Sequence, residues 1–253
     1  MMGNDMTGKV ALVTGAGVGI GRATAELLAA RGAFVGIHYR SSAEGAQAVL
    51  DGIRARGGDG MLLQADLLFE DQAIPVVEGV VAKTGRLDIL VNNAGSPVER
   101  TRIEDCSLEL WRLVLDTNLT SAFLVTRAAI PHLRATGNAA IVNNLSLSVQ
   151  TGGANGAGPY AVAKGGLQVL TRTLARELAP AVRVNAVMPG VIETAHHERY
   201  STPERMRHYA AETPLGRNGK AEEVAETIVF LASDAASFIN GALVDISGGR
   251  FLR

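Results

Sequence analysis

Short apolar runs alternate with longer amphipathic stretches along the chain. Seven runs are short and mostly apolar: 9–14, 33–39, 61–65, 87–91, 141–145, 183–187 and 242–246. Their length and bounding turn residues predict buried strands. Because helical patterns separate these runs, the chain predicts a parallel sheet with helices on both faces. We expect a doubly wound, Rossmann-type α/β fold with three layers, in a single domain spanning residues 1–253.

Helical spacing of apolar residues is clearest after the second strand run. Ala46, Val49, Leu50 and Ile53 follow an i, i+3, i+4, i+7 pattern. In all, helices are predicted at six stretches, of which 46–53 is the one just described: 20–31, 46–53, 71–83, 108–136, 160–178 and 224–231. Each connects two strand runs, as a parallel sheet requires.

The predicted helix at 108–136 contains a polar interruption. Leu119, Phe123, Ile130 and Leu133 are expected to make one apolar face, and Asn118 breaks that pattern. A single asparagine in a helix either faces solvent or, beside an apolar face, holds a water molecule or bends the helix. The sequence leaves both interpretations open.

A polar segment from Glu193 to Thr213 follows the sixth strand run. It is rich in His, Arg and Tyr and has no sustained apolar face. We expect a mobile lid over a site. His196 and His197 are adjacent, but cysteine and acidic partners at ligand spacing are lacking beyond two glutamates, so no metal site is predicted.

Charge and composition limit the classes of partner. The 253 residues carry a formal net charge of -1, so no strong field attracts nucleic acid or an anionic membrane. We expect a small-molecule partner, without nucleic acid or membrane binding. The amino terminus lacks the apolar core of a signal peptide, and Cys106 is the only cysteine. These features predict a cytoplasmic protein.

A glycine-rich turn follows the first strand run. Gly15, Gly19 and Gly21 lie between that strand and a predicted helix. Such a turn lets backbone approach a phosphate at the positive end of the helix, although a tight strand–helix connection without a ligand also uses glycine. No Gly-Lys-Ser/Thr ends the turn, which argues against a P-loop nucleotide triphosphatase.

Residues at the ends of the next two strands bear on a dinucleotide. The second strand run ends in Tyr39 and Arg40, where an acidic residue would favour NAD(H) and an arginine accommodates the 2′-phosphate of NADP(H). Arg40 therefore favours NADP(H), unless it is an ordinary solvated charge. Asp66 follows the third strand and either accepts a hydrogen bond from an adenine or caps the next helix.

Tyr160 and Lys164 are the candidate proton-transfer pair. Their i, i+4 spacing places both on one helix face. An ammonium close to a phenol favours the phenolate and brings its pKa toward neutrality. A surface pair on a helix is the plain alternative. Asn92 and Ser146 also follow strand runs, and in such sheets ligands bind beyond the carboxyl ends of the strands.

Taken together, these motifs resemble the short-chain dehydrogenase/reductase family over nearly the whole chain, particularly its 3-oxoacyl reductase-like members. The matching elements are Thr14-Gly15-x-x-x-Gly19-x-Gly21, Asn92-Asn93-Ala94-Gly95, Asn118, Ser146, Tyr160-x-x-x-Lys164 and Pro189-Gly190-x-x-x-Thr194.

The resemblance implies a role for each matched residue. Tyr160 would donate or accept the proton, Lys164 would lower its pKa and hold the nicotinamide ribose, Ser146 would polarise the substrate oxygen, and Asn118 would hold a relay water. The implied cofactor contacts are Gly15, Gly19, Ile20, Gly21, Arg40, Asp66, Leu67, Asn92, Ala94, Gly95, Tyr160, Lys164, Pro189, Ile192 and Thr194.

Two positions depart from the family pattern. Ser146 and Tyr160 lie 14 positions apart, about one more than the pattern, and Ser148 lies two residues nearer to Tyr160. Ser146 is retained because it follows the strand directly, with Ser148 as a lesser candidate. Val18 stands where many NADP(H)-dependent members carry a basic residue, so the NADP(H) expectation rests mainly on Arg40.

The expected function is NADP(H)-dependent interconversion of a ketone, such as a 3-oxoacyl compound, and a secondary alcohol, with NAD(H) possible. Alternatives are an NAD(H)-dependent sugar or polyol dehydrogenase and a non-catalytic dinucleotide sensor. The residues from Phe238 to Leu252 resemble the family's subunit contact, which implies a homotetramer, or failing that a dimer.

Overall fold

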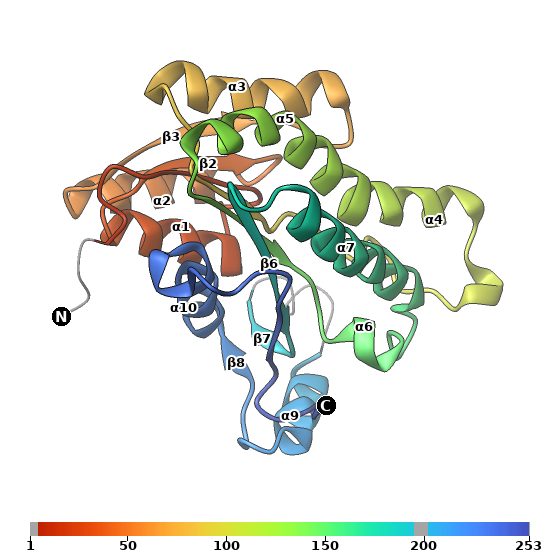
Figure 1. Ribbon diagram of the computed structural model, residues 1–253. Helices are drawn as coiled ribbons and strands as arrows, with labels where there is room; N and C mark the ends of the chain where they lie inside the picture. The colour runs from red at the N-terminus through yellow and green to blue at the C-terminus, as the bar shows by residue number, and fades with distance from the viewer. Residues whose placement is uncertain (1–4, 195–201, 253) are drawn as a thin grey trace.

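A computed structural model describes residues 5–194 and 202–252, and its main feature is a parallel sheet (Figure 1). Seven strands lie in the order β3-β2-β1-β4-β5-β6-β9. They are β1 (Val10–Val13), β2 (Phe34–Tyr39), β3 (Asp59–Gln64), β4 (Ile89–Asn92), β5 (Ala139–Asn144), β6 (Val182–Pro189) and β9 (Leu243–Ile246). Each neighbouring pair is parallel, so the predicted sheet is confirmed.

Helices connect the strands. The principal ones are α1 (Gly19–Ala30), α2 (Ala43–Ala55), α3 (Glu70–Thr84), α4 (Leu108–Leu115), α5 (Ser121–Thr136), α7 (Gly158–Glu177), α9 (Pro203–Glu212) and α10 (Ala221–Ala232). Shorter elements are η1 (Ile103–Asp105), η2 (Asp116–Thr120), α6 (Ser148–Thr151), η3 (Asp234–Ala236) and the two-stranded pair β7 (Ile192–Glu193) and β8 (Gly219–Lys220).

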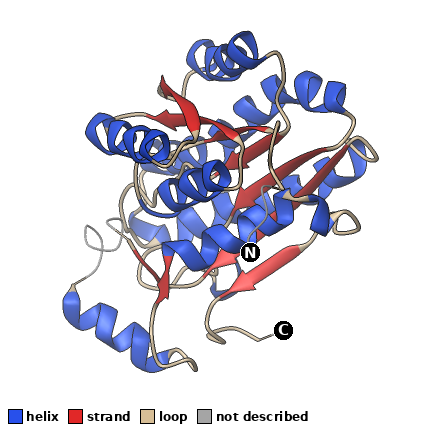
Figure 2. Ribbon diagram, turned by 90° about the vertical axis from the view of Figure 1, so that its left-hand side faces the viewer, coloured by secondary structure: helices blue, strands red, loops and turns tan. Residues whose placement is uncertain are grey.

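The helices form two layers, one on each face of the sheet (Figures 1 and 2). One apolar core joins the sheet to α1, α2 and α10, where Leu28, Val49 and Ile228 are buried. The other joins it to α3, α5 and α7, where Val77 and Leu133 are buried. This arrangement is the three-layer Rossmann-type fold that the alternating pattern predicted.

Strand order reverses between β1 and β4. From β1 the chain proceeds outward to β2 and β3, then returns to β4 on the other side of β1. The loops that leave β1 and β4 therefore diverge, which opens a crevice at the carboxyl edge of the sheet. The fold thus places the glycine turn and the Asn92–Gly95 segment at the same position.

The segment 108–136 is helical throughout but not one regular helix. Residues 116–120 form a π-helical turn, η2, between α4 and α5. Phe123, expected on the buried face, is exposed, because the buried face of α5 contains Val125, Ala129 and Leu133, and a residue two positions before Val125 lies on the opposite side of the helix. By length and composition this segment could cross a membrane, but α5 packs on α3 and its residues Val125 and Leu133 belong to the core.

The third helix begins at Glu70, one residue from the expected start near Asp71, and both acidic residues favour a helix amino terminus. One other expectation requires correction. The described part of the expected lid contains a regular helix, α9. This helix was not expected, because the segment has no sustained apolar face. Thr202 caps it by accepting a hydrogen bond from the Arg205 N–H at 3.3 Å, and Pro203 begins it.

Candidate active site

A cleft of about 550 Å³ lies at the carboxyl ends of the central strands. It runs between the loops that follow the six strands from β1 to β6. The predicted site residues that line it are Gly15, Gly19, Ile20, Arg40, Asp66, Leu67, Ala94, Gly95, Ser146, Tyr160, Lys164, Pro189, Ile192 and Thr194. These residues come from most of the chain's length and are brought together at the cleft.

The glycine turn at one end of the cleft depends on the absence of side chains. Gly15 and Gly19 have φ values of 63° and 55°, which are strained for other residues. Gly21 does not line the cleft. A Cβ there would lie 2.3 Å from the Gly15 carbonyl oxygen, so this glycine lets α1 pack against the turn rather than contacting a ligand directly.

His38 holds the turn, a role that the sequence did not reveal. The Gly15 N–H donates to His38 Nδ1 at 3.1 Å, so the other ring nitrogen, Nε2, carries the proton and donates to the Ala65 carbonyl at 3.2 Å. Burial lowers the pKa of His38 to about 4, which keeps the ring neutral. The ring therefore couples the glycine turn to the end of β3.

Arg40 and Asp66 face each other across the same end of the cleft. Arg40 Nη1 lies 3.9 Å from Asp66 Oδ2, and both residues keep solvent access. Asp66 Oδ1 also accepts the Leu68 N–H at 3.2 Å, so the carboxylate shapes the turn before α3 while lining the cleft. Val18 is exposed there and supplies no charge.

Asn92 does not line the cleft, contrary to expectation. Its Nδ2 donates to Thr126 Oγ1 at 2.8 Å and to Asn143 Oδ1 at 2.9 Å. Asn143 in turn donates to Thr171 at 2.9 Å. The alternation of strand side chains turns Asn92 toward the α5 and α7 layer, and the following residue, Asn93, lines the cleft instead.

Tyr160, Lys164 and Ser146 meet at the middle of the cleft. Tyr160 and Lys164 lie one turn apart on α7, with Lys164 Nζ 5.8 Å from the centroid of the Tyr160 ring. Lys164 is 2 % exposed, and its Nζ donates to the Asn144 carbonyl at 2.8 Å. An ammonium has three N–H donors, so the others are available for a ligand in the cleft.

The electrostatics of this pair differ from the expectation. Burial raises the pKa of Tyr160 to about 12, although a hydrogen bond with Ser146 and the charge of Arg100 act in the opposite direction. Burial also lowers the pKa of Lys164 to about 8. The Lys164 ammonium, 5.8 Å from the ring centroid, does not bring the phenol pKa to neutrality, because the effect of burial is larger.

Asn118 is buried within the π-helical turn, which removes the solvent-facing interpretation. Its Nδ2 donates to the carbonyls of Ser96 at 2.7 Å and Val114 at 2.9 Å, and its Oδ1 accepts the Ser96 N–H at 2.9 Å. The side chain thereby fixes the loop after β4. Gly95 lies between it and Lys164, since a Cβ on Gly95 would be 2.6 Å from Asn118 Oδ1 and 3.0 Å from Lys164 Nζ.

Ser146 and Ser148 are distinguished by their partners. The Ser146 hydroxyl accepts the Ser148 N–H at 3.2 Å and is the serine that hydrogen-bonds Tyr160. Ser148 also lines the cleft, and its buried hydroxyl oxygen has no hydrogen-bond partner among the described residues. The geometry therefore favours Ser146 for contact with a substrate oxygen beside Tyr160.

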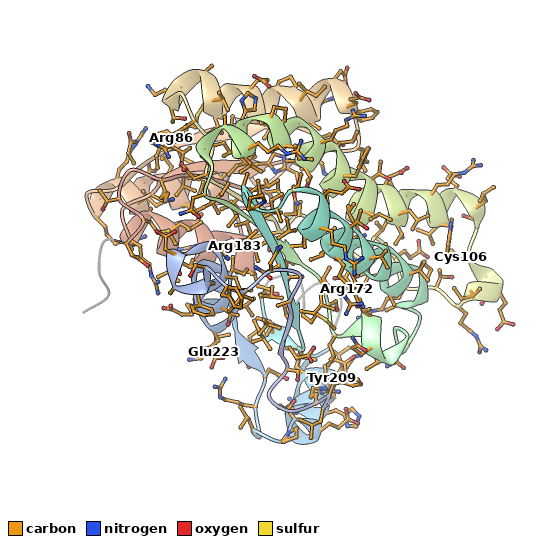
Figure 3. All side chains as sticks on the ribbon, viewed as in Figure 1. Arg86, Cys106, Arg172, Arg183, Tyr209 and Glu223 are labelled. Atoms are coloured by element: carbon orange, nitrogen blue, oxygen red, sulfur yellow. The ribbon has the colours of Figure 1, made fainter. Side chains whose placement is uncertain are left out.

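Three residues at the far end of the cleft were missed by the sequence reasoning: Arg100, Tyr209 and Arg250. They come from the loop after β4, from α9 and from the carboxyl-terminal segment. Tyr209 lies on α9 close to the chain's end (Figure 3). No local motif marks such residues, because the tertiary fold alone brings them together. His196, His197, Arg199 and Tyr200 of the expected lid lie outside the described residues.

The cleft has the features of a dinucleotide site. The glycine turn at the amino end of α1 provides backbone N–H groups for a phosphate, and only glycine fits its close approaches. Arg40 lies at one end, and the free donors of Lys164 lie beside Tyr160. This arrangement can bind a nicotinamide dinucleotide with its reactive end near a phenol that donates or accepts a proton.

Comparison with known proteins identifies the same family that the sequence motifs resemble. Residues 15–250 match a family described as enoyl-(acyl carrier protein) reductase. Two relatives are each 41% identical: a cis-4-hydroxycyclohexanecarboxylate dehydrogenase from Sinomonas cyclohexanicum, with 98% of both chains covered, and a 3-oxoacyl-[acyl-carrier-protein] reductase from Thermotoga maritima, with 96% of this chain and 98% of the relative covered.

A solved structure shares the whole fold. The crystal structure of the NADH-dependent reductase A1-R′, responsible for alginate metabolism, superposes with a TM-score of 0.90 at 33% identity, covering 99% of this chain and 100% of the other. The protein is therefore an oxidoreductase that acts on CH–OH groups with a nicotinamide cofactor. The chain belongs to the short-chain dehydrogenase/reductase family.

Proposed function

We propose that the protein interconverts a ketone and a secondary alcohol with NADP(H), and that Tyr160 is the acid/base. One observation carries this proposal: Tyr160 and Lys164 from α7 and Ser146 from the end of β5 line one cleft, which continues to the glycine turn and Arg40. The relatives named 3-oxoacyl-[acyl-carrier-protein] reductases support a 3-oxoacyl or similar carbonyl substrate.

In the proposed mechanism the cofactor supplies or accepts a hydride, and the protein's own groups handle the proton. Ser146 donates a hydrogen bond to the substrate oxygen and so holds it beside the Tyr160 hydroxyl. During reduction, Tyr160 gives its proton to the oxygen as negative charge develops there. During oxidation, the phenolate takes the alcohol proton. Lys164 holds a cofactor ribose and stabilises the phenolate by its charge.

The expected cofactor is NADP(H) because Arg40 directly follows β2, at the position where an acidic residue would accept a hydrogen bond from the ribose 2′-hydroxyl of NAD(H). Its guanidinium is exposed, lines the cleft and can pair with a 2′-phosphate. Arg40→Asp should lower the preference for NADP(H) over NAD(H) by roughly 10–100-fold, as the loss of a charged hydrogen bond implies. Arg56→Asp, at the other end of α2 and outside the cleft, is the control. An unchanged preference in Arg40→Asp would remove Arg40 from the proposal.

A panel of ketones and secondary alcohols, assayed with NADPH, NADH and their oxidised forms, tests the activity itself. We expect turnover in both directions and faster turnover with the phosphorylated cofactor. Tight cofactor binding without turnover on any compound would favour a dinucleotide sensor. Turnover that is confined to polyols with NAD(H) would instead support the sugar or polyol dehydrogenase alternative.

We further infer that the protein is a homotetramer. Large apolar side chains on the carboxyl-terminal segment support this, since Phe238 and Leu252 are almost fully exposed. Apolar side chains of this kind are common at subunit contacts. Light scattering on the purified protein should give four times the monomer mass of 26.4 kDa. A monomer would contradict the inference, and a dimer would limit it to one interface.

A further inference from the structure

The far end of the cleft holds a group of positive charges with few acidic partners. Arg100 and Arg250 line the cleft, and Arg205 of α9 lies close enough to Arg100 for their charges to interact. Glu212 pairs with Arg250 at 2.8 Å. Among the described cleft-lining residues the only acid is Asp66, at the opposite end beside Arg40. This end of the cleft therefore has excess positive charge.

Two guanidinium nitrogens in this group are buried without hydrogen-bond partners among the described residues. They are Arg100 Nε and Arg205 Nη2. Buried donors are nearly always paired, and two adjacent like charges repel each other. Burial, together with the charge of Arg205, lowers the pKa of Arg100. An anion beside Arg100 would relieve this repulsion.

The position of Arg100 is set by the segment that leads into α7. The Thr101 N–H donates to the Gly156 carbonyl at 2.9 Å, and Arg100 Nη1 donates to the Asn155 carbonyl at 3.4 Å. Gly156 has a φ of 79°, and a Cβ there would lie 3.0 Å from the Thr101 nitrogen. This close contact holds Arg100 against the loop four residues before Tyr160. The positions of the Arg100 and Tyr160 side chains are therefore fixed relative to each other.

Arg205 and Tyr209 hold the other side of the group. Arg205 Nε donates to the Tyr209 hydroxyl at 2.5 Å, and its guanidinium lies 5.4 Å from the Tyr209 ring centroid. Arg250 stacks over the same ring at 5.1 Å and donates to the Tyr209 carbonyl at 2.7 Å. The aromatic ring holds both of these cations, whereas Arg100 lines the cleft itself and donates from Nη1 to the Asn155 carbonyl.

We propose that Arg100 binds a carboxylate of the substrate, so that the enzyme acts on oxo acids and hydroxy acids. A guanidinium presents planar N–H edges that can take a carboxylate through two parallel hydrogen bonds. Arg205 and Arg250 add attraction for the negative charge. The carbonyl to be reduced then lies at Tyr160. This inference rests on the proposed ketone and alcohol chemistry and names its substrate class.

A binding measurement tests the anchor without requiring turnover. Calorimetry would compare cyclohexanecarboxylate with cyclohexanecarboxamide on protein saturated with the nicotinamide cofactor. Wild type should bind the carboxylate at least about tenfold more tightly, because a charged hydrogen-bonded pair is lost with the amide. Arg100→Gln should abolish that difference. Arg102→Gln, an exposed arginine of the same loop that pairs with Glu104, should retain it. Equal affinities in wild type would overturn the proposal.

Kinetics separate this proposal from the proposed function. With 5-oxohexanoate and its methyl ester, Arg100→Gln should raise KM for the acid by roughly 10–100-fold and leave the two compounds with similar KM values. Its effect on kcat should be the same for both compounds. An equal rise in KM for acid and ester would refute the anchor while leaving ketone reduction intact. If the carboxylate binds as expected but no ketone is turned over, the proposed function fails and the anchor stands.

Discussion

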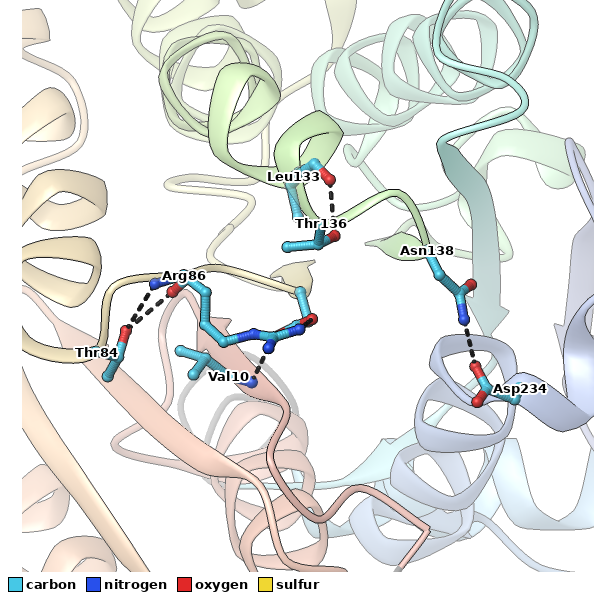
Figure 4. A network of polar contacts seen from close by, with 8 residues as sticks. Val10, Thr84, Arg86, Leu133, Thr136, Asn138 and Asp234 are labelled. Atoms are coloured by element: carbon cyan, nitrogen blue, oxygen red, sulfur yellow. Dashed lines mark hydrogen bonds and ion pairs between the residues drawn. The ribbon is translucent and has the colours of Figure 1, made fainter.

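The two ends of the parallel sheet hold different kinds of buried polar groups. At the amino ends of the strands, Asp88 is 1 % exposed, and its carboxylate accepts from the Val10 N–H at 2.9 Å and from Arg86 at 2.6 and 2.9 Å. Thr84 accepts from and donates to Arg86 nearby, and Asn138 donates to Asp234 at 3.0 Å (Figure 4). Each of these side chains has a partner, so this end is built for stability.

At the carboxyl ends, buried polar groups remain only partly paired. Lys164 makes one hydrogen bond to the Asn144 carbonyl, while Ser148 Oγ and Arg100 Nε have none among the described residues. The pKa values of Tyr160 and Lys164 are displaced by burial in opposite directions. Such groups lower stability unless a ligand satisfies them, which is typical of a functional site.

The largest predicted effect is a loss of activity on substitution at the carboxyl end of the sheet. Lys164→Met should reduce kcat by roughly 10²–10⁴-fold, because the phenolate loses the charge that stabilises it. The same change removes a poorly solvated ammonium, so the midpoint of thermal unfolding should stay equal or rise. Lys83→Met, on an exposed position near the end of α3, is the matched control and should retain kcat. A variant with full kcat would contradict the role of Lys164.

The amino end should show the reverse behaviour. Asp88→Ala leaves the Val10 N–H unpaired, which should lower the free energy of unfolding by about 2 kcal/mol. The ion pair between Arg86 and Asp88 contributes less to stability, because Arg86 is partly exposed and solvent screens its charge. Urea denaturation would measure the loss, and kcat at 25 °C should stay within about twofold. A large loss of kcat in a folded variant would remove the distinction between the two ends.

The pH dependence sharpens the comparison further. Because burial raises the pKa of Tyr160 to about 12, the phenol is protonated over the neutral range. Ketone reduction needs that protonated form, so its rate should be nearly constant from pH 6 to 8. Alcohol oxidation needs the phenolate, so its kcat/KM should rise by about tenfold per pH unit over the same range. Parallel profiles in the two directions would argue against Tyr160 as the acid/base.

Local patterns were sufficient to predict the fold and most of the central site. The spacing of Val49, Leu50 and Ile53 gave the buried face of α2, and the spacing of Tyr160 and Lys164 gave one face of α7. Both follow from the 3.6-residue period of a helix. Loops after parallel strands converge at one edge, which explains why motifs far apart in sequence line the same cleft.

The remaining features depend on contacts that no local pattern records. Asn118 lies in a π-helical turn that only its bonds to Ser96 and Val114 explain. Asn93 lines the cleft instead of the expected Asn92, because the exact end of β4 decides which side chain faces the cleft. His38 and Arg100 act through partners more than 20 residues away. Their chemistry becomes visible only when those partners are in place.

Tyr160→Phe, with both turnover and stability measured, tests the central claim most directly. The substitution removes one hydroxyl from the cleft and leaves the packing of α7 unchanged. We predict that kcat falls by at least about 10²-fold. Cofactor affinity should stay within about threefold of wild type, and the free energy of unfolding should stay within about 1 kcal/mol. Near-normal turnover in Tyr160→Phe would contradict the assignment of proton transfer to this residue and, with it, the functional role given to this end of the sheet.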